Sequence, residues 1–272
     1  MEVSIDHGNV AIYIIEGIII FAILFNIFRA RKGKKLFIRR IPGLSALDEA
    51  VGRATEMGRP MLYSPGIRGI DIVGLQSMAI LSHVIRQAAK FGSKTIVPVA
   101  DALLFTVAEE VTKDAYSAEG VPEMFESQDV RFLSERQFSW ASGVVGIQHR
   151  EKVASCFYFG SFFAESLIVA ENGQMVGAIQ IAGTPSTTQI PFFLATCDYT
   201  IIGDEYFAAS AYLSREPTLL GSLVGQDYGK FLIVIIMFIG AIIATIAANS
   251  SNTELINFLD NYFLKYFPGG IK

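Results

Sequence analysis

Cysteine, proline and tryptophan are scarce in this chain, which has 2 Cys, 9 Pro and 1 Trp among its 272 residues. So few cysteines exclude a disulfide scaffold, and 24 Gly with 9 Pro are too few for a collagen-like repeat. Charged residues make up only 18%, below the soluble norm of about 25%, while hydrophobic residues make up 51%. This balance excludes intrinsic disorder and, with a mean hydropathy of +0.43, indicates a membrane protein.

Two long apolar runs account for the high content of hydrophobic residues. Residues 10–28 contain a single carboxylate, Glu16, and residues 231–248 contain no charged residue. As helices, the runs would reach about 27–28 Å, close to the ~30 Å hydrocarbon core of a bilayer. We therefore expect transmembrane helices at 10–28 and 230–248, separated by a basic linker at 29–43 and a folded domain at 44–229.

The flanks of the first run predict the orientation. Residues 1–9 carry only Glu2, Asp6 and His7, whereas basic residues crowd the other side. Because positive charge stays in the cytoplasm, we expect both chain ends outside and the central domain in the cytoplasm. Positive charges after the run, rather than before it, favour an uncleaved anchor over a signal peptide. The basic residues are Arg29, Arg31, Lys32, Lys34, Lys35, Arg39 and Arg40.

Charge also bears on the partners. The basic residues beside the first run serve as a topology signal, and they also attract anionic membrane lipid. Residues 41–229 carry 21 acidic and 12 basic side chains, and an acidic surface argues against nucleic acid as a partner.

The C-terminal segment, residues 249–272, contains a capping box, Ser251-Asn252-Thr253-Glu254, followed by aromatic and leucine residues at helical spacing. This helix is too short and too polar to span a bilayer. It either lies flat on the outer leaflet or packs on a neighbouring subunit.

The central domain alternates short β-branched runs with longer segments of helical period. Strands are expected at 60–64, 95–99, 130–133, 154–159, 176–182 and 199–202. Helices are expected at 45–57, 71–91, 101–118, 135–151, 162–171 and 186–196, with a last one from about 206 and a linker or helical piece at 219–226. The alternation predicts an α/β fold with a doubly wound, mostly parallel sheet of about six strands.

Loops at the strand ends are where chemistry is expected, because an open parallel sheet binds its ligands at the carboxyl ends of its strands. The loops after the predicted strands are small and polar. Their exposed amides and hydroxyls at helix N-termini suit a small anionic ligand carrying phosphate or carboxylate. The candidate ligand-binding residues are Ser64, Gly66, Asp101, Gly160, Ser161, Gly183, Thr184, Ser186, Asp204 and Glu205.

These residues also have a structural interpretation. Thr184 and Ser186 cap a helix as readily as they bind an anion, and Asp101 is either a helix N-cap or a general base; we favour capping for all three. The glycines fit neither GxGxxG nor GxxxxGK[ST], and GxSxG is absent around Ser161. No dinucleotide, P-loop or serine-hydrolase site is therefore predicted.

Metal and cofactor sites have little support. No His/Cys cluster has zinc spacing, which leaves only the strand-end Asp and Glu side chains as ligands, and we predict no metal site. No cofactor is assigned. Cys156 and Cys197 lie in apolar surroundings and are expected to be buried, free thiols.

Glu16 is unusual, because a carboxylate inside a membrane helix marks by default a pair or an ion pathway. It is expected to be neutral, or to hydrogen-bond to Thr245 or to another subunit. We favour pairing, because two helices offer too few polar residues for a pathway. Gly240, Ala244 and Ala248 form a small-residue ridge that lets a partner helix approach closely, which favours a homo-oligomer.

Residues 47–226 carry long phrases such as LDEAVGRATEMGRP, FFAESLIVAENG, GAIQIAGT and PFFLATCDYTIIGDE. In these phrases the chain resembles an uncharacterised family of prokaryotic membrane proteins, known as a domain of unknown function. The resemblance implies a prokaryotic cell membrane and a domain that comes with membrane helices. It brings no catalytic residues.

Three functions are consistent with these features. The leading hypothesis is a non-catalytic, self-associating scaffold module, anchored in the membrane, that binds a small anionic ligand. The first alternative is a membrane-tethered hydrolase or transferase that acts on a phosphorylated or acyl metabolite with Asp101, Ser161, Thr184, Asp204 and Glu205. The second is an accessory subunit of a transporter or membrane complex.

Overall fold

Six parallel strands form one sheet in the order β3-β2-β1-β4-β5-β6, which confirms the predicted α/β fold class. The computed structural model describes residues 10–33 and 41–249. The strands are β1 (Met61–Gly66), β2 (Thr95–Val99), β3 (Val130–Phe132), β4 (Ser155–Ser161), β5 (Ile179–Thr184) and β6 (Tyr199–Ile202).

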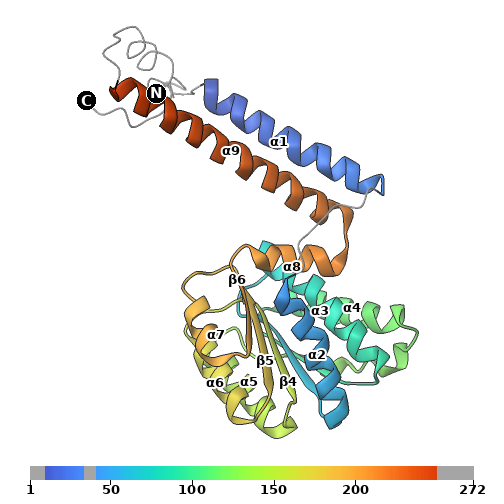
Figure 1. Cartoon of the computed structure of the whole chain (residues 1–272). Helices are drawn as coiled ribbons and strands as arrows, with labels where there is room; N and C mark the ends of the chain where they lie inside the picture. Colours follow the sequence, from blue (N-terminus) through green and yellow to red (C-terminus); the bar gives the residue numbers. More distant parts are fainter. Residues whose placement is uncertain (1–9, 34–40, 250–272) are drawn as a thin grey trace, which may run out of the picture. The chain divides into compact units, whose positions relative to one another are not determined.

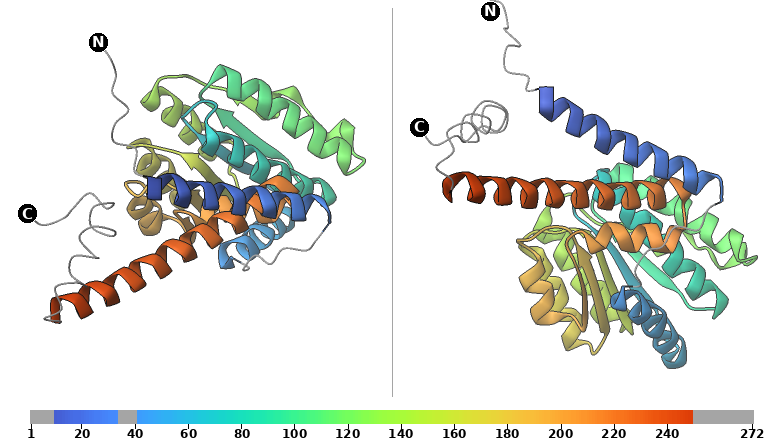
Figure 2. Two further views of the ribbon diagram at one scale, coloured as in Figure 1. Left: turned by 90° about the horizontal axis from the view of Figure 1, so that it is seen from above. Right: turned by 45° about the horizontal axis from the view of Figure 1, so that its top comes forward.

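Helices cover both faces of the sheet because its strands are apolar on both sides. Tyr63 and Phe157 point into one core, and their neighbours Leu62 and Tyr158 point into the other. The first core is closed by α2 (Pro42–Met57), α3 (Ile72–Lys90), α4 (Ala102–Ala118) and α8 (Glu205–Ser214). The second is closed by α5 (Gln137–Glu151), α6 (Glu165–Met175) and α7 (Ile190–Thr196) (Figure 1, Figure 2).

Two short 3-10 helices, η1 (Pro122–Met124) and η2 (Ser127–Asp129), join α4 to β3. The sequence did not predict them. All the other elements of the domain were predicted, with boundaries that differ by a few residues. The chain divides into two units, an α/β lobe whose described residues are 41–215 and a helical unit whose described residues are 10–33 and 216–249.

The helical unit contains α1 (Val10–Arg31) and α9 (Pro217–Asn249), which lie side by side (Figure 1, Figure 2). Both helices are long and apolar enough to span a membrane, at Tyr13–Arg31 and Pro217–Ile242. The second helix begins at Pro217 rather than near residue 230, so of the two alternatives for 219–226 the helical one is correct, and the segment belongs to this unit.

A glycine ridge on α9 determines how the two helices pack. A Cβ atom at Gly225 would lie 2.5 Å from the Cα of Ile23, and one at Gly221 would overlap the backbone of Ile27. One turn further along α9, Gly229 packs against Ile19. The three glycines are spaced four residues apart and face α1 in antiparallel order, which allows the two backbones to approach closely.

Candidate functional site

The strand order identifies the place in the lobe where a ligand is expected. The chain crosses from β1 towards β2 and β3 on one side, and from β4 towards β5 and β6 on the other. In doubly wound sheets, the loops after two such strands diverge at the switch point and form the ligand crevice. Here these loops follow Gly66 in β1 and Ser161 in β4.

Backbone pairing closes the floor of this crevice. Gly66 pairs with Ser161 after a shift in register between Ser64 and Gly66, and the Ile67 N–H donates to the Ser161 carbonyl oxygen at 3.1 Å. A Cβ at Gly160 would overlap the Pro65 carbonyl oxygen, and one at Gly66, whose φ is +88°, would overlap the Ser161 carbonyl oxygen. The predicted residues Gly66, Gly160 and Ser161 therefore come together, and the two glycines are required by this close approach.

A cation lies across the switch point. The Arg68 guanidinium, in the loop after β1, lies 5.7 Å from the ring centroid of Phe163, in the loop after β4. Its side chain is 59% exposed, and its nearest carboxylate, Asp71, lies 3.7 Å away. Such a cation–π contact holds the guanidinium in place while leaving its donors available to an anion.

The carboxylates at this edge are engaged with helix N-termini. Asp101 accepts a hydrogen bond from the Leu104 N–H at 2.7 Å, as the N-cap of α4. Asp71 does the same for α3, through the Gly74 N–H at 2.7 Å. The capping interpretation of Asp101 is therefore confirmed.

Glu165, at the first turn of α6, is a fully buried carboxylate that the sequence analysis missed. It accepts from the Phe163 N–H at 2.8 Å and from the Gln137 amide at 2.6 Å. The signal was an acidic residue shortly after a predicted strand end, in the phrase FFAES. Its partners identify it as a residue that fixes the loop carrying Phe163.

The loop after β5 is held by its own side chains. The Ser186 N–H donates to the Thr184 hydroxyl at 3.3 Å, and the hydroxyls of Ser186 and Thr188 lie 3.0 Å apart. Gly183, in β5, packs against the Phe159 ring. The hydroxyl groups thus order the turn before α7, but neither caps the helix, because its N-cap is Gln189, which makes no side-chain cap bond. The capping interpretation of Thr184 and Ser186 is therefore wrong.

The remaining strand-end residues are spread along the edge. Ser64 is buried within β1, where its hydroxyl accepts from the Gly66 N–H at 3.3 Å. Asp204 and Glu205 begin α8, after β6. Four strand spacings separate β2, which precedes Asp101, from β6, which is about 19 Å at ~4.8 Å per spacing. The residues of the enzyme alternative do not therefore converge on one point.

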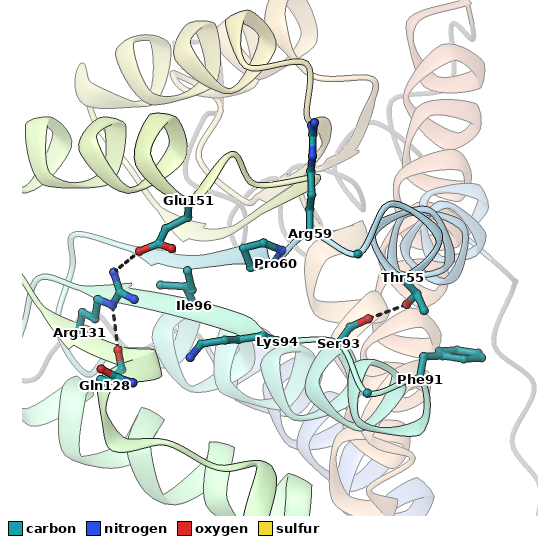
Figure 3. A pocket seen from close by; sticks show the side chains of 12 residues that line it. Thr55, Arg59, Pro60, Phe91, Ser93, Lys94, Ile96, Gln128, Arg131 and Glu151 are labelled. Atoms are coloured by element: carbon teal, nitrogen blue, oxygen red, sulfur yellow. Dashed lines mark hydrogen bonds and ion pairs between the residues drawn. The ribbon is translucent and has the colours of Figure 1, made fainter.

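A cavity of about 590 Å³ lies at the opposite edge, where the strands begin (Figure 3). Three helices, α2, α3 and α5, end there, and helix C-termini favour cations. The lining side chains include Thr55, Arg59, Phe91, Ser93, Lys94, Gln128, Arg131 and Glu151.

Two of the three cations that line this cavity, Lys94 and Arg131, are paired with carboxylates, and the third is Arg59. The Lys94 ammonium lies 2.7 Å from Asp129 and 2.8 Å from Glu126. The Arg131 guanidinium lies 3.2 Å from Glu151 (Figure 3). These pairs raise the pKa of Lys94 despite partial burial. Burial raises the pKa of Asp129, and the attraction of Lys94 only partly offsets it.

Metal and thiol chemistry have no clear place in the lobe. Within residues 10–33 and 41–249, no group of three or more His, Cys, Asp or Glu side chains could hold a metal ion. Both cysteines are free, Cys156 buried and Cys197 half-buried, and burial raises the pKa of each thiol to about 12. Such thiols stay protonated and are poor nucleophiles.

The predicted pair of Glu16 and Thr245 is not brought together. The register that joins Ile19 to Gly229 places Glu16 opposite Leu232, and Thr245 lies about 20 Å further along α9 at ~1.5 Å per residue. The Thr245 hydroxyl donates instead to the Ala241 carbonyl oxygen at 2.8 Å. Glu16 is exposed. Gly240 is half-buried on α9, and the side chains of Ala244 and Ala248 lie outside the description.

Basic residues mark the end of α1. The Lys32 ammonium lies 4.3 Å from the centroid of the Phe28 ring, and the Arg29 guanidinium lies 5.8 Å from that of Phe25. Arg31 donates to the Thr218 hydroxyl at 3.4 Å. Lys34, Lys35, Arg39 and Arg40, like the predicted C-terminal helix, lie outside the described residues.

Comparison with known proteins identifies one family. A family model described as "Domain of unknown function (DUF6754)" matches residues 2–256. Comparisons with curated proteins and with solved structures gave no match. The match extends from the first apolar helix, through the whole lobe, into the segment after the second, and so confirms the resemblance found in the sequence. The chain belongs to the DUF6754 family.

Proposed function

We propose that the protein is a multi-pass protein of a prokaryotic cell membrane, in which α1 and α9 anchor the lobe on the cytoplasmic side and both chain ends lie outside. The fit of Gly221, Gly225 and Gly229 against α1 carries this proposal. In lipid, helices associate mainly through close packing, which small residues permit. Arg29, Arg31 and Lys32, where α1 leads towards the lobe, set the orientation.

The lobe, in this proposal, acts as a scaffold and binding module rather than as an enzyme. Asp71, Asp101 and Glu165 are the carboxylates closest to the switch point, and each is used to hold a helix start or a loop. Self-association accompanies this role, because the exposed carboxylate of Glu16 at membrane depth favours a protein neighbour over lipid.

The ligand that suits the switch point is a small anion carrying phosphate or carboxylate. Arg68 provides the positive charge, and the N-termini of α3 and α6, which begin beside it, add the favourable ends of their dipoles. The exposed ring of Phe163 offers an apolar surface next to the cation.

Thermal unfolding of the full chain in nanodiscs of phosphatidylcholine alone, which hold no anionic lipid, tests this site with pyrophosphate and ADP as probes. At a concentration about 100 times Kd, a bound probe should raise Tm by about 5–10 °C. The variant Arg68→Ala should lose this shift. The control Arg86→Ala, which removes an exposed cation on α3, should keep it. Equal shifts in all three proteins, or none with either probe, would contradict an anion site at Arg68.

A further inference from the structure

Large apolar side chains are exposed along the strand-end edge of the lobe. Six of them, between 43% and 69% exposed, lie in loops after strands or in the first turn of the following helix. They are Ile70, Ile72, Leu75, Leu103, Phe138 and Phe163, called here the apolar edge. An exposed apolar group of this extent marks an interaction surface.

Contacts between neighbouring loops make the apolar edge continuous. The Asp101 carboxylate is 2.9 Å from the Cβ position of Gly69, so the loop before α3 touches the start of α4. The Arg68–Phe163 contact joins the loops after β1 and β4. The start of α5 adjoins that of α6, because the amide of Gln137 donates to Glu165.

The opposite edge differs in character. Its exposed apolar residues include Met57, Phe91 and Met175 at the C-terminal ends of three separate helices, with Leu194 near the end of α7 and Tyr199 at the start of β6. Between two of these ends lies the polar cavity with its ion pairs. That edge therefore provides matched control positions on the same lobe.

We propose that the apolar edge rests on the lipid surface of the membrane that holds α1 and α9, with Arg68 and Arg136 against the phosphates of anionic headgroups. Both arginines are exposed and flank apolar residues, Phe163 and Phe138 respectively. Apolar side chains with cations beside them enter the boundary between headgroups and acyl chains.

The attachment of the lobe supports a lipid surface as the occupant. The chain enters the lobe at this edge, since the Cβ position of Gly43, in the first turn of α2, is 2.8 Å from Ile201 near the end of β6. Where the chain leaves the lobe, only Arg215 and Glu216 separate α8 from α9. Connections this short keep the lobe within reach of the bilayer surface.

The inference rests on the proposed membrane anchoring, and it names a lipid headgroup as the source of the anion at Arg68. Spin labels on the full chain in nanodiscs of phosphatidylcholine and phosphatidylglycerol test both claims separately. Single cysteines replace Ile72, Leu103, Met175 and Phe21 in a Cys197→Ser background, since Cys156 is buried. Power saturation then compares access of oxygen, which partitions into lipid, with access of a water-soluble nickel chelate.

Labels at Ile72 and Leu103 should be more accessible to oxygen than to nickel, and the label at Met175 should show the reverse. Equal nickel access at all three positions would overturn lipid docking. The label at Phe21, on the exposed face of α1, reports on anchoring alone. If it too is in water, the membrane anchoring itself is wrong; if only Ile72 and Leu103 are in water, the docking is wrong.

Two further versions of the spin-label experiment identify what contacts the apolar edge. Removing phosphatidylglycerol, or introducing Arg68→Ala with Arg136→Ala, should raise nickel access at Leu103, while Arg86→Ala should not. Inorganic phosphate should leave nickel access unchanged, and a change with phosphate in place of lipid would overturn the headgroup as the source. If neither oxygen nor the nickel chelate reaches the labels, and the spectra show dipolar broadening between labels on two copies, a second copy covers the apolar edge. This result would also overturn the proposal.

Discussion

Gly225 of α9 lies directly against the backbone of Ile23 in α1, so close that a Cβ atom at position 225 would be 2.5 Å from the Ile23 Cα. One turn earlier, a Cβ at Gly221 would overlap the Ile27 backbone in the same way, and one turn later a Cβ at Gly229 would meet the Ile19 side chain at 3.3 Å. The two helices therefore meet backbone to backbone at Gly221 and Gly225, and a larger side chain at either position must push them apart.

Replacing Gly225 by leucine should separate the helices. Overpacking of this kind costs about 1–3 kcal/mol. The thermal unfolding temperature of the protein in detergent should fall, and α9 should be cleaved faster by added protease. The control is Gly17→Leu, because a Cβ at Gly17 meets nothing within 4 Å. Equal effects of the two substitutions would contradict the glycine ridge.

Gly160→Ala should severely destabilise the lobe. The added Cβ would overlap the Pro65 carbonyl oxygen between two central strands, which cannot move apart without breaking their ladder. We expect a loss of about 3 kcal/mol or more in the free energy of unfolding. Gly177→Ala tests the alternative that only backbone strain matters, since Gly177 has a φ of +75° and open space around it. It should cost about 1–2 kcal/mol, measured by chemical denaturation.

His83 should make the lobe less stable as the pH falls. Burial lowers the pKa of His83 below its usual 6.5, and the attraction of Asp48, 3.5 Å away, only partly offsets this. The unfolded chain therefore binds a proton at a higher pH than the folded chain, and stability falls as pH drops through 6.5 towards the folded pKa. Urea denaturation between pH 8 and pH 5.5 should show the loss.

Substitutions at His83 and Asp48 test whether this pair causes the pH dependence of stability. His83→Gln should flatten the pH dependence in that range. Asp48→Asn should steepen it, because removing the carboxylate lowers the pKa of His83 further. A slope that is the same in His83→Gln as in the natural protein would assign the effect to other groups.

Lys94→Met should leave the Asp129 carboxylate, only 1% exposed, without its cation. The cost should be about 1–3 kcal/mol at neutral pH, the penalty of an unsatisfied buried group. Because burial already raises the pKa of Asp129, this carboxyl group should become neutral as the pH falls, and the cost should shrink. Glu126→Gln removes the exposed partner of Lys94 and should change stability by less than about 0.5 kcal/mol. Comparable losses would show that Asp129 is not the sensitive partner.

The sequence predicted the sheet because strands covered on both faces appear as short apolar runs between amphipathic helices. It also predicted that Asp101 caps a helix, which depends only on local spacing. Three of the candidate residues, Gly66, Gly160 and Ser161, do meet, because strand order brings the ends of β1 and β4 together. The same strand order places Asp101 and Asp204 far apart along the edge, and this separation could not be predicted without knowing the order.

Other features depend on contacts between distant segments. The start of α9 was left open as a linker or a helical piece, because glycines at 221 and 225 weaken a helix unless a partner helix fills the space beside them. Arg68 was overlooked because its partner, Phe163, follows a different strand. The cavity at the other edge was missed, because its lining comes from helix ends that sequence reasoning treats as turns.

The central claim is that two paired helices hold the lobe on the cytoplasmic side of a membrane. Labelling of a single cysteine at Met175, on the exposed end of α6, tests it most directly in bacterial cells that express the Cys197→Ser protein. A membrane-impermeant maleimide should leave this cysteine unmodified in intact cells and should modify it fully after the inner membrane is permeabilised. Modification in intact cells would place the lobe outside and contradict the account.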